Sequence, residues 1–210
     1  MSHCSKYPFT FSDEETVVRA FRRMGVETSY DIIASYNNEL AKKLSKYIPG
    51  LETKSAKAIC GNKDGINMFA CKIEDNRFEL ICEHPHITDI VAERMNELQS
   101  EFYEAYIDSA INQMVRKIEN TGLPTKIEKE GNQRIVLFGP AYEYSVIVSF
   151  DGNSIQEEVS GVKGDFCLSL TEELENLLSH PNVDIETTYK ECFQVQVEDK
   201  SLQVLKLEFQ

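Results

Sequence analysis

Apolar side chains recur every three or four residues in four stretches of the chain, and each stretch predicts an amphipathic helix. The first follows Ser12-Asp13-Glu14-Glu15, where we expect Ser12 and Glu15 to cap the free amides, and it ends at Gly25. The second runs from about Tyr30 to Tyr47. The third covers Thr88 to Asn120, a length of about 50 Å if it is unbroken, and the fourth ends near Leu178.

Segments between these helices alternate apolar and polar residues or are rich in β-branched and aromatic residues, which predicts strands. The expected strands cover Lys6–Phe11, parts of 56–83, Lys126–Glu130, Arg134–Phe138, Tyr144–Phe150, Ser154–Val159 and parts of 183–210. Short turns join neighbouring strands, which favours antiparallel pairing. We therefore predict an α+β fold of two small sheet-and-helix units, with mainly antiparallel strands and one long helix in the N-terminal unit.

Gly139-Pro140 is the expected domain boundary, because the strand pattern restarts after it. This predicts an N-terminal α+β domain over residues 1–139, with an insertion near 28–56, and a small β-β-α-β domain over 141–210. Charge differs between the two parts. Residues 1–140 hold 18 basic and 21 acidic side chains, a net charge of −3, whereas residues 141–210 hold 4 and 14, a net charge of −10.

The acidic C-terminal part repels phosphate backbones, so we expect no nucleic-acid binding. It favours basic protein partners or simply solubility. The chain has no long apolar run and no apolar signal core after its first residues, so we expect a cytosolic protein without a membrane partner. The six cysteines form no C-x-x-C pair and are expected to be reduced, most of them buried.

A glycine-rich loop before the last helix carries the most suggestive chemistry, with Gly161, Lys163, Gly164 and Cys167. Such a loop could hold a phosphate, present a reactive thiol, or simply turn the chain from strand to helix. The order of glycine and lysine does not match a P-loop. Cys167 shares a helical stripe with apolar residues through Leu178, so we expect it to point into the core, and the loop to be a turn.

Cys82, His84 and His86 alternate at the end of a predicted strand, which would place all three on one face. With His3 or Cys4 as a fourth ligand, they form a candidate zinc site. Pro85 weakens the strand, and the alternative is an ordinary strand-to-helix corner. We expect no other cofactor.

The N-terminal part resembles domain of unknown function twelve-fifty-seven, a family of small bacterial and plastid proteins that includes the plastid hypothetical reading-frame-thirty-five proteins. The insertion near 28–56 is not part of that family's pattern. The features that carry the resemblance are Met1-Ser2-His3, Arg23-Met24-Gly25, Asn76-Arg77-Phe78-Glu79-Leu80, Tyr103, Tyr106, Gly122 and the hairpin from Ile127 to Val136.

The C-terminal part resembles domain of unknown function twenty-nine ninety-seven, through Asp151-Gly152, the run from Val159 to Gly164, Cys167 and the helix that follows. The short proteins of this family are often encoded beside those of the first, so the chain looks like a fusion of the two. Neither family has an assigned activity. Their genes lie near MoxR-type AAA+ ATPases, so the resemblance implies an accessory or adaptor role.

The sequence contains no Ser-His-Asp order, H-E-x-x-H or G-x-G-x-x-G motif. We therefore expect a non-catalytic binding or adaptor protein that assists an AAA+ ATPase. The alternative is a metal- or thiol-dependent, redox-associated protein that uses Cys82, His84 and His86. A third hypothesis is an enzyme with its site in the cleft between two domains.

Overall fold

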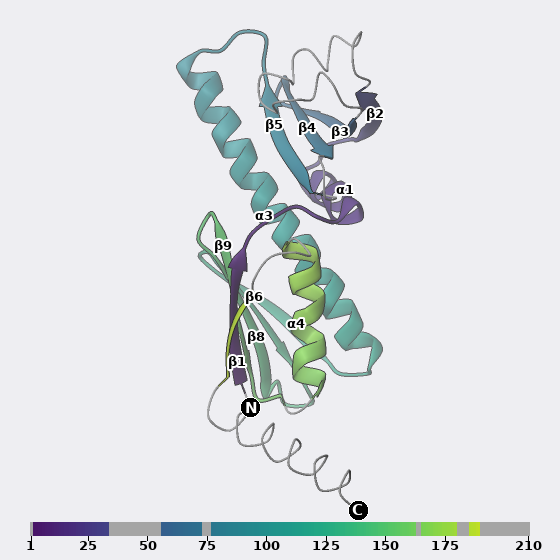
Figure 1. The fold of residues 1–210 in the computed structure, drawn as a ribbon, viewed down its shortest axis with the longest axis vertical. Coiled ribbons are helices and arrows are strands. Elements are labelled where there is room, and N and C mark those ends of the chain that lie inside the picture. Colours follow the sequence, from purple (N-terminus) through teal and green to yellow (C-terminus); the bar gives the residue numbers. More distant parts are fainter. Residues whose placement is uncertain (1, 34–55, 73–76, 163–164, 180–184, 190–210) are drawn as a thin grey trace, which may run out of the picture. The chain divides into compact units, whose positions relative to one another are not determined.

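The computed structural model describes residues 2–33, 56–72, 77–162, 165–179 and 185–189. The chain forms two compact units (Figure 1). One is Thr10–Ala110; the other combines Met1–Phe9 with Ile111–Gln210. Antiparallel sheets and helices make up both units, which confirms the predicted α+β class.

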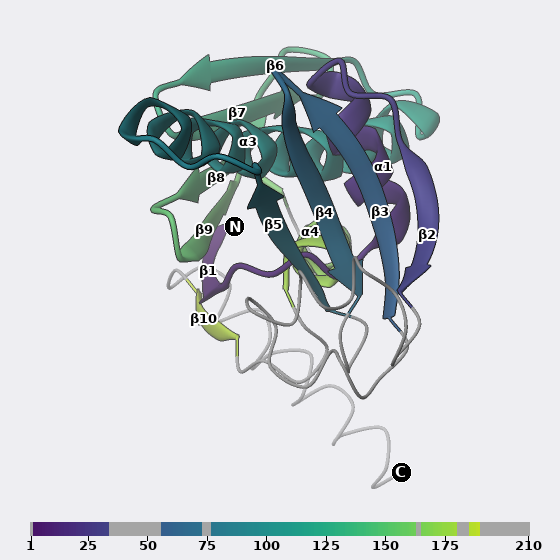
Figure 2. The same cartoon turned by 90° about the horizontal axis from the view of Figure 1, so that it is seen from above.

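In the unit Thr10–Ala110, the described strands form a four-stranded antiparallel sheet in the order β2-β3-β4-β5 (Figure 2). Their bounds are Ser29–Ile33, Ala56–Lys63, Ile66–Lys72 and Phe78–Glu83. Helix α1 covers Glu14–Arg23, and α3 begins at Asp89. Phe21 of α1 and Phe102 of α3 are fully buried with ring centroids 4.9 Å apart, so the two helices share one core.

The N-terminus of α1 is capped differently from the prediction. Asp13, not Ser12, is the N-cap residue, and its carboxylate accepts a hydrogen bond of 2.7 Å from the Thr16 amide. The Tyr106 hydroxyl accepts hydrogen bonds from the Ser12 and Asp13 amides, at 3.2 and 3.1 Å. Asp13 and a buried tyrosine far away in the sequence therefore share the role expected of the Ser12–Glu15 capping box.

The helix predicted from Tyr30 to Tyr47 is wrong at its start, because Ser29–Ile33 is strand β2. Tyr30 is opposite Ile59 and Ile32 is opposite Lys57 in the antiparallel ladder with β3. Aromatic and β-branched residues fit a strand as well as a helix stripe, and pairing with β3 decides between them. The rest of that predicted helix, and most of the insertion, lie outside the described residues.

In the other unit, the described strands form a six-stranded antiparallel sheet in the order β10-β1-β9-β8-β7-β6. Strand β1 is Ser2–Pro8, earlier than the predicted Lys6–Phe11. The other strands are β6 Thr125–Glu130, β7 Gln133–Phe138, β8 Tyr144–Phe150, β9 Ser154–Ser160 and β10 Glu186–Tyr189. Alternate residues on neighbouring strands, such as Val136, Val146 and Val159, pair across the sheet and are fully buried.

Helix α3 is Asp89–Asn120, an unbroken element of 32 residues that matches the predicted helix almost to the residue. Its residues up to Ala110 belong to one unit and those from Ile111 to the other. Helix α4 is Asp165–Leu178. Among the residues that the structure describes, no helix combines the length and apolar character that crossing a bilayer requires.

The chain divides at places other than the predicted boundary at Gly139-Pro140. Strands β7 and β8, on either side of those residues, pair from Gln133↔Ser149 to Phe138↔Tyr144. The predicted domains 1–139 and 141–210 therefore contribute to one sheet. Strand β1 joins the same sheet by pairing with β9 and β10. The pairings of β1 connect distant parts of the chain, so they leave no local signal in the sequence.

Alkaline pH is expected to destabilise the unit Thr10–Ala110. Burial raises the pKa of Cys71 from 9.0 to about 12 and the pKa of Cys82 from 9.0 to about 11. Burial also raises the pKa of Tyr106 from 10.0 to about 12. Above pH 9.0 the unfolded chain releases protons that the folded chain keeps, so stability is complete below that pH and falls as pH rises.

For each group, the loss is at most about 1.4 kcal/mol per pH unit between its two pKa values. Urea midpoints measured from neutral pH upward should fall steeply above pH 9.0. Replacing Cys71 and Cys82 with alanine should flatten the decline. A midpoint independent of alkaline pH in the natural chain would contradict the burial of these groups.

Candidate functional site

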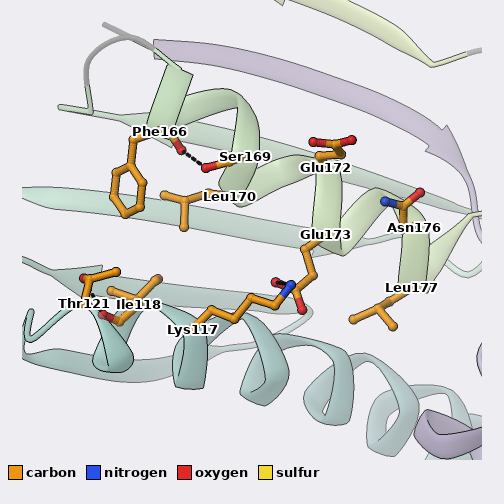
Figure 3. Close-up of a pocket in the computed structure, with 10 residues that line it drawn as sticks. All are labelled: Lys117, Ile118, Thr121, Phe166, Ser169, Leu170, Glu172, Glu173, Asn176 and Leu177. Atoms are coloured by element: carbon orange, nitrogen blue, oxygen red, sulfur yellow. Dashed lines mark hydrogen bonds and ion pairs between the residues drawn. The ribbon is translucent and has the colours of Figure 1, made fainter.

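A groove lies between α4 and the last turns of α3, within the unit that holds the six-stranded sheet (Figure 3). Its volume is about 530 Å³. Lys117 and Ile118 in the last turn of α3, and Thr121 just after it, line one side. A cavity of this size lies in the range that ligand-binding sites usually have.

Helix α4 faces the groove with a stripe of side chains spaced three or four residues apart. Phe166, Leu170, Glu173 and Leu177 point towards α3, while Glu172 and Asn176 point away (Figure 3). Leu174 and Leu178 are fully buried, so α4 packs into the core with a separate set of leucines. The helix thus has one apolar side for the core and a second one that lines the groove.

The floor of the groove is apolar and partly open to solvent. Ile118 and Leu170 are buried, Leu177 is half-buried, and Phe166 is 36% exposed. The Phe166 ring also lies edge-on to Phe138 of β7, with centroids 6.4 Å apart. Phe166 is therefore anchored on the sheet while part of its ring stays accessible.

One ion pair crosses the groove. The Lys117 Nζ atom of α3 lies 2.6 Å from Oε2 of Glu173 on α4. The Lys117 side chain is 67% exposed, whereas Glu173 is 15% exposed. The Lys117 end of this pair is open to solvent, whereas the mostly buried Glu173 carboxylate is stabilised by having a cation beside it.

Gly161, in the glycine-rich loop before α4, packs closely against the start of β8. Gly161 has a φ of +83°, and a Cβ atom there would lie 2.6 Å from the Glu143 carbonyl oxygen. This close approach supports the interpretation of the loop as a turn. Lys163 and Gly164 lie outside the described residues, as does the side chain of Cys167, whose inward orientation stays a prediction.

Cys82 is buried at the end of β5, while His84 is half-buried and His86 is exposed in the loop that follows. The His84 Nδ1 atom lies 2.6 Å from the His86 carbonyl oxygen and 3.2 Å from its amide nitrogen. Among the described residues, no three His, Cys, Asp or Glu side chains are grouped so that they could hold a metal ion. The side chains of His3 and Cys4 are not described, so a zinc site that includes them stays a prediction.

Sequence reasoning missed the groove. The apolar repeat predicts one core-facing stripe that runs from Cys167 to Leu178 and includes Leu177, but Leu177 lines the groove. The spacing of Phe166, Glu173 and Leu177 was the signal for a second stripe. That α3 lies beside this second stripe follows only from the packing of both helices in one unit.

Comparison with known proteins supports the C-terminal resemblance. No curated protein matches the chain. Residues 145–183, which include most of β8, all of β9 and all of α4, match the model of a family described as "Protein of unknown function (DUF2997)". The segment of the chain that is similar to this family therefore supplies the α4 side of the groove.

Proposed function

We propose that this chain is a non-catalytic adaptor that binds a partner protein in the groove between α3 and α4. The partly exposed Phe166, in the same groove as the buried Ile118 and Leu170, is the observation that carries this proposal. Aromatic and aliphatic side chains that are partly open in a groove are typical anchors of protein interfaces. Polar side chains at the margin of the groove, such as Ser169 and Glu172, help to keep the protein soluble when no partner is bound.

A MoxR-type AAA+ ATPase is the first partner to test. The support comes from the family resemblances, which imply an accessory role beside such ATPases. We also infer that the N-terminal part is related to domain of unknown function twelve-fifty-seven, on the residues given above. Under this proposal the protein works in the cytosol as a soluble partner of the ATPase.

Site-specific photocrosslinking in the native host tests this function. A photoreactive amino acid in place of Ser169, at the groove margin, should capture one recurrent protein that mass spectrometry identifies. The same group in place of the exposed Glu130, on β6, is the matched control and should not capture it. Equal crosslinking from both positions would contradict a specific role for the groove.

The captured protein, purified, is then titrated with variants of the full chain. Leu177→Asp places a charge on the groove wall and should weaken binding about tenfold or more. Ile127→Asp makes the same kind of change at a 41% exposed side chain on β6 and should bind like the natural chain. Capture of a protein other than the ATPase would leave the groove as a binding site and remove the ATPase assignment.

A further inference from the structure

We propose that the groove between α3 and α4 takes a basic amphipathic helix, with an apolar side chain on Phe166 and Leu170 and a cation on Glu173. This inference rests on the proposed function, since it names the chemical class of the partner segment. Three features of the groove carry it: its apolar floor, the charge of α4, and the ion pair that crosses it.

The floor suits a row of apolar side chains. Phe166, Leu170 and Leu177 lie along α4 at helical spacing, and Ile118 faces them from α3. A helix laid along such a groove contacts it through residues that recur every three or four positions. The apolar row on α4, with Ile118 opposite, therefore matches one apolar helix face.

The charge of α4 selects the polar side of that helix. Its sequence, Asp165–Leu178, contains four carboxylates and no basic residue. The segment 141–210 as a whole has a net charge of −10. Such a field attracts cations and repels acidic surfaces, which disfavours a second copy of this chain and an anionic membrane.

The Lys117–Glu173 pair shows how a cation is held there. An ammonium group already lies 2.6 Å from the Glu173 carboxylate, next to the apolar floor. Lys117 is the more exposed partner and can swing into solvent. A lysine or arginine of the partner can then take its place on Glu173, and arginine can do so with two hydrogen bonds.

Two synthetic probes test this directly with the full chain. One is a leucine-lysine amphipathic helix of about four turns, and the other carries glutamate in place of every lysine. Fluorescence anisotropy should show saturable binding of the basic probe alone. Binding should weaken as salt is added, because the contacts are partly ionic. Equal binding of both probes would overturn the charge assignment.

Charge-matched variants locate the contact. Glu173→Gln should weaken binding of the basic probe about three- to tenfold, whereas Glu130→Gln, on β6, should leave it unchanged. Lys117→Met removes the competing cation and should tighten binding severalfold. Lys126→Met, with the same change in net charge outside the groove, should have no comparable effect. Identical effects within each pair would mean general attraction to the acidic surface and would overturn the proposal.

The two proposals can fail separately. In one outcome, the photocaptured partner binds the natural chain but not Leu177→Asp, and the basic probe does not bind. The groove is then a protein-binding site, but its partner segment is not a basic amphipathic helix. If neither the partner nor the probe responds to Leu177→Asp, both proposals are wrong. Cosedimentation of the natural chain with anionic lipid vesicles, lost in Leu177→Asp, would point to a membrane partner and overturn the present one.

Discussion

Phe102→Ala is expected to lower the free energy of unfolding by about 3–5 kcal/mol, the usual cost of removing a buried phenylalanine. The Phe102 ring is fully buried at the centre of the aromatic core of the unit Thr10–Ala110. Its centroid lies 4.9 Å from Phe21, 5.2 Å from Phe11 and 6.4 Å from Tyr106. The substitution therefore leaves a cavity that rigid neighbouring rings cannot fill.

Urea unfolding followed by circular dichroism measures this loss. Ile90→Ala, on the same helix, is the control, because its side chain is 79% exposed and its truncation should change stability by less than about 0.5 kcal/mol. If Phe102→Ala lowered the free energy of unfolding no more than Ile90→Ala, this would contradict the place of Phe102 at the centre of the core.

Gly161→Ala is expected to destabilise the unit that holds α4 by about 2–5 kcal/mol, through backbone strain and steric overlap together. The φ of +83° is unfavourable for alanine. The added Cβ would also lie 2.6 Å from the Glu143 carbonyl oxygen and 3.0 Å from Cδ1 of Tyr144. Since the first contact is with backbone, it cannot be relieved by a side-chain rotation.

Gly122→Ala is a close control for this prediction. Gly122 has a φ of +85° in the same unit, but nothing lies within 4 Å of its added Cβ. It should therefore show only the conformational cost, about 1–2 kcal/mol. Equal unfolding midpoints for the two variants would contradict the close packing of the loop before α4. If Gly161→Ala unfolds at a lower midpoint than Gly122→Ala, it should also bind the partner more weakly, because α4 forms one wall of the groove.

Features set by neighbouring residues were predictable from the sequence. The apolar repeat located α3 to within one residue, because its stripe is long and ends at Gly122, with a φ of +85°. The hairpin of β6 and β7 was found from Gly131-Asn132, since glycine at a positive φ there allows the tight turn. These signals lie within a few residues of the structure that they specify.

Features that depend on distant pairing were not predictable. The chain's first strand completes a sheet with β9 and β10, far along the sequence. Tyr30 and its neighbours form a strand because β3 pairs with them. The Asp13 cap and the Tyr106 hydroxyl likewise meet only in the folded unit. In each case a contact with a distant segment of the same chain, rather than the local sequence pattern, decides the structure.

The groove falls between these two cases. Each helix displays its apolar residues in the sequence, yet one apolar stripe of α4 is enough to explain its burial in the core. The second stripe can be recognised as the wall of a groove only when α3 lies beside it, with Lys117 opposite Glu173. In the glycine-rich loop before this wall, Gly161 packs closely against Glu143 and Tyr144.

Amide chemical-shift mapping of the isotope-labelled full chain, titrated with the basic leucine-lysine helix, tests the groove as a binding site most directly. Shifts should concentrate on Ile118, Thr121, Ser169 and Leu177, which lie on both walls, and should saturate with the affinity found by anisotropy. They should be absent in Leu177→Asp. Shifts spread evenly over acidic residues, or confined to strands such as β6, would show that the groove is not where this chain binds its partner.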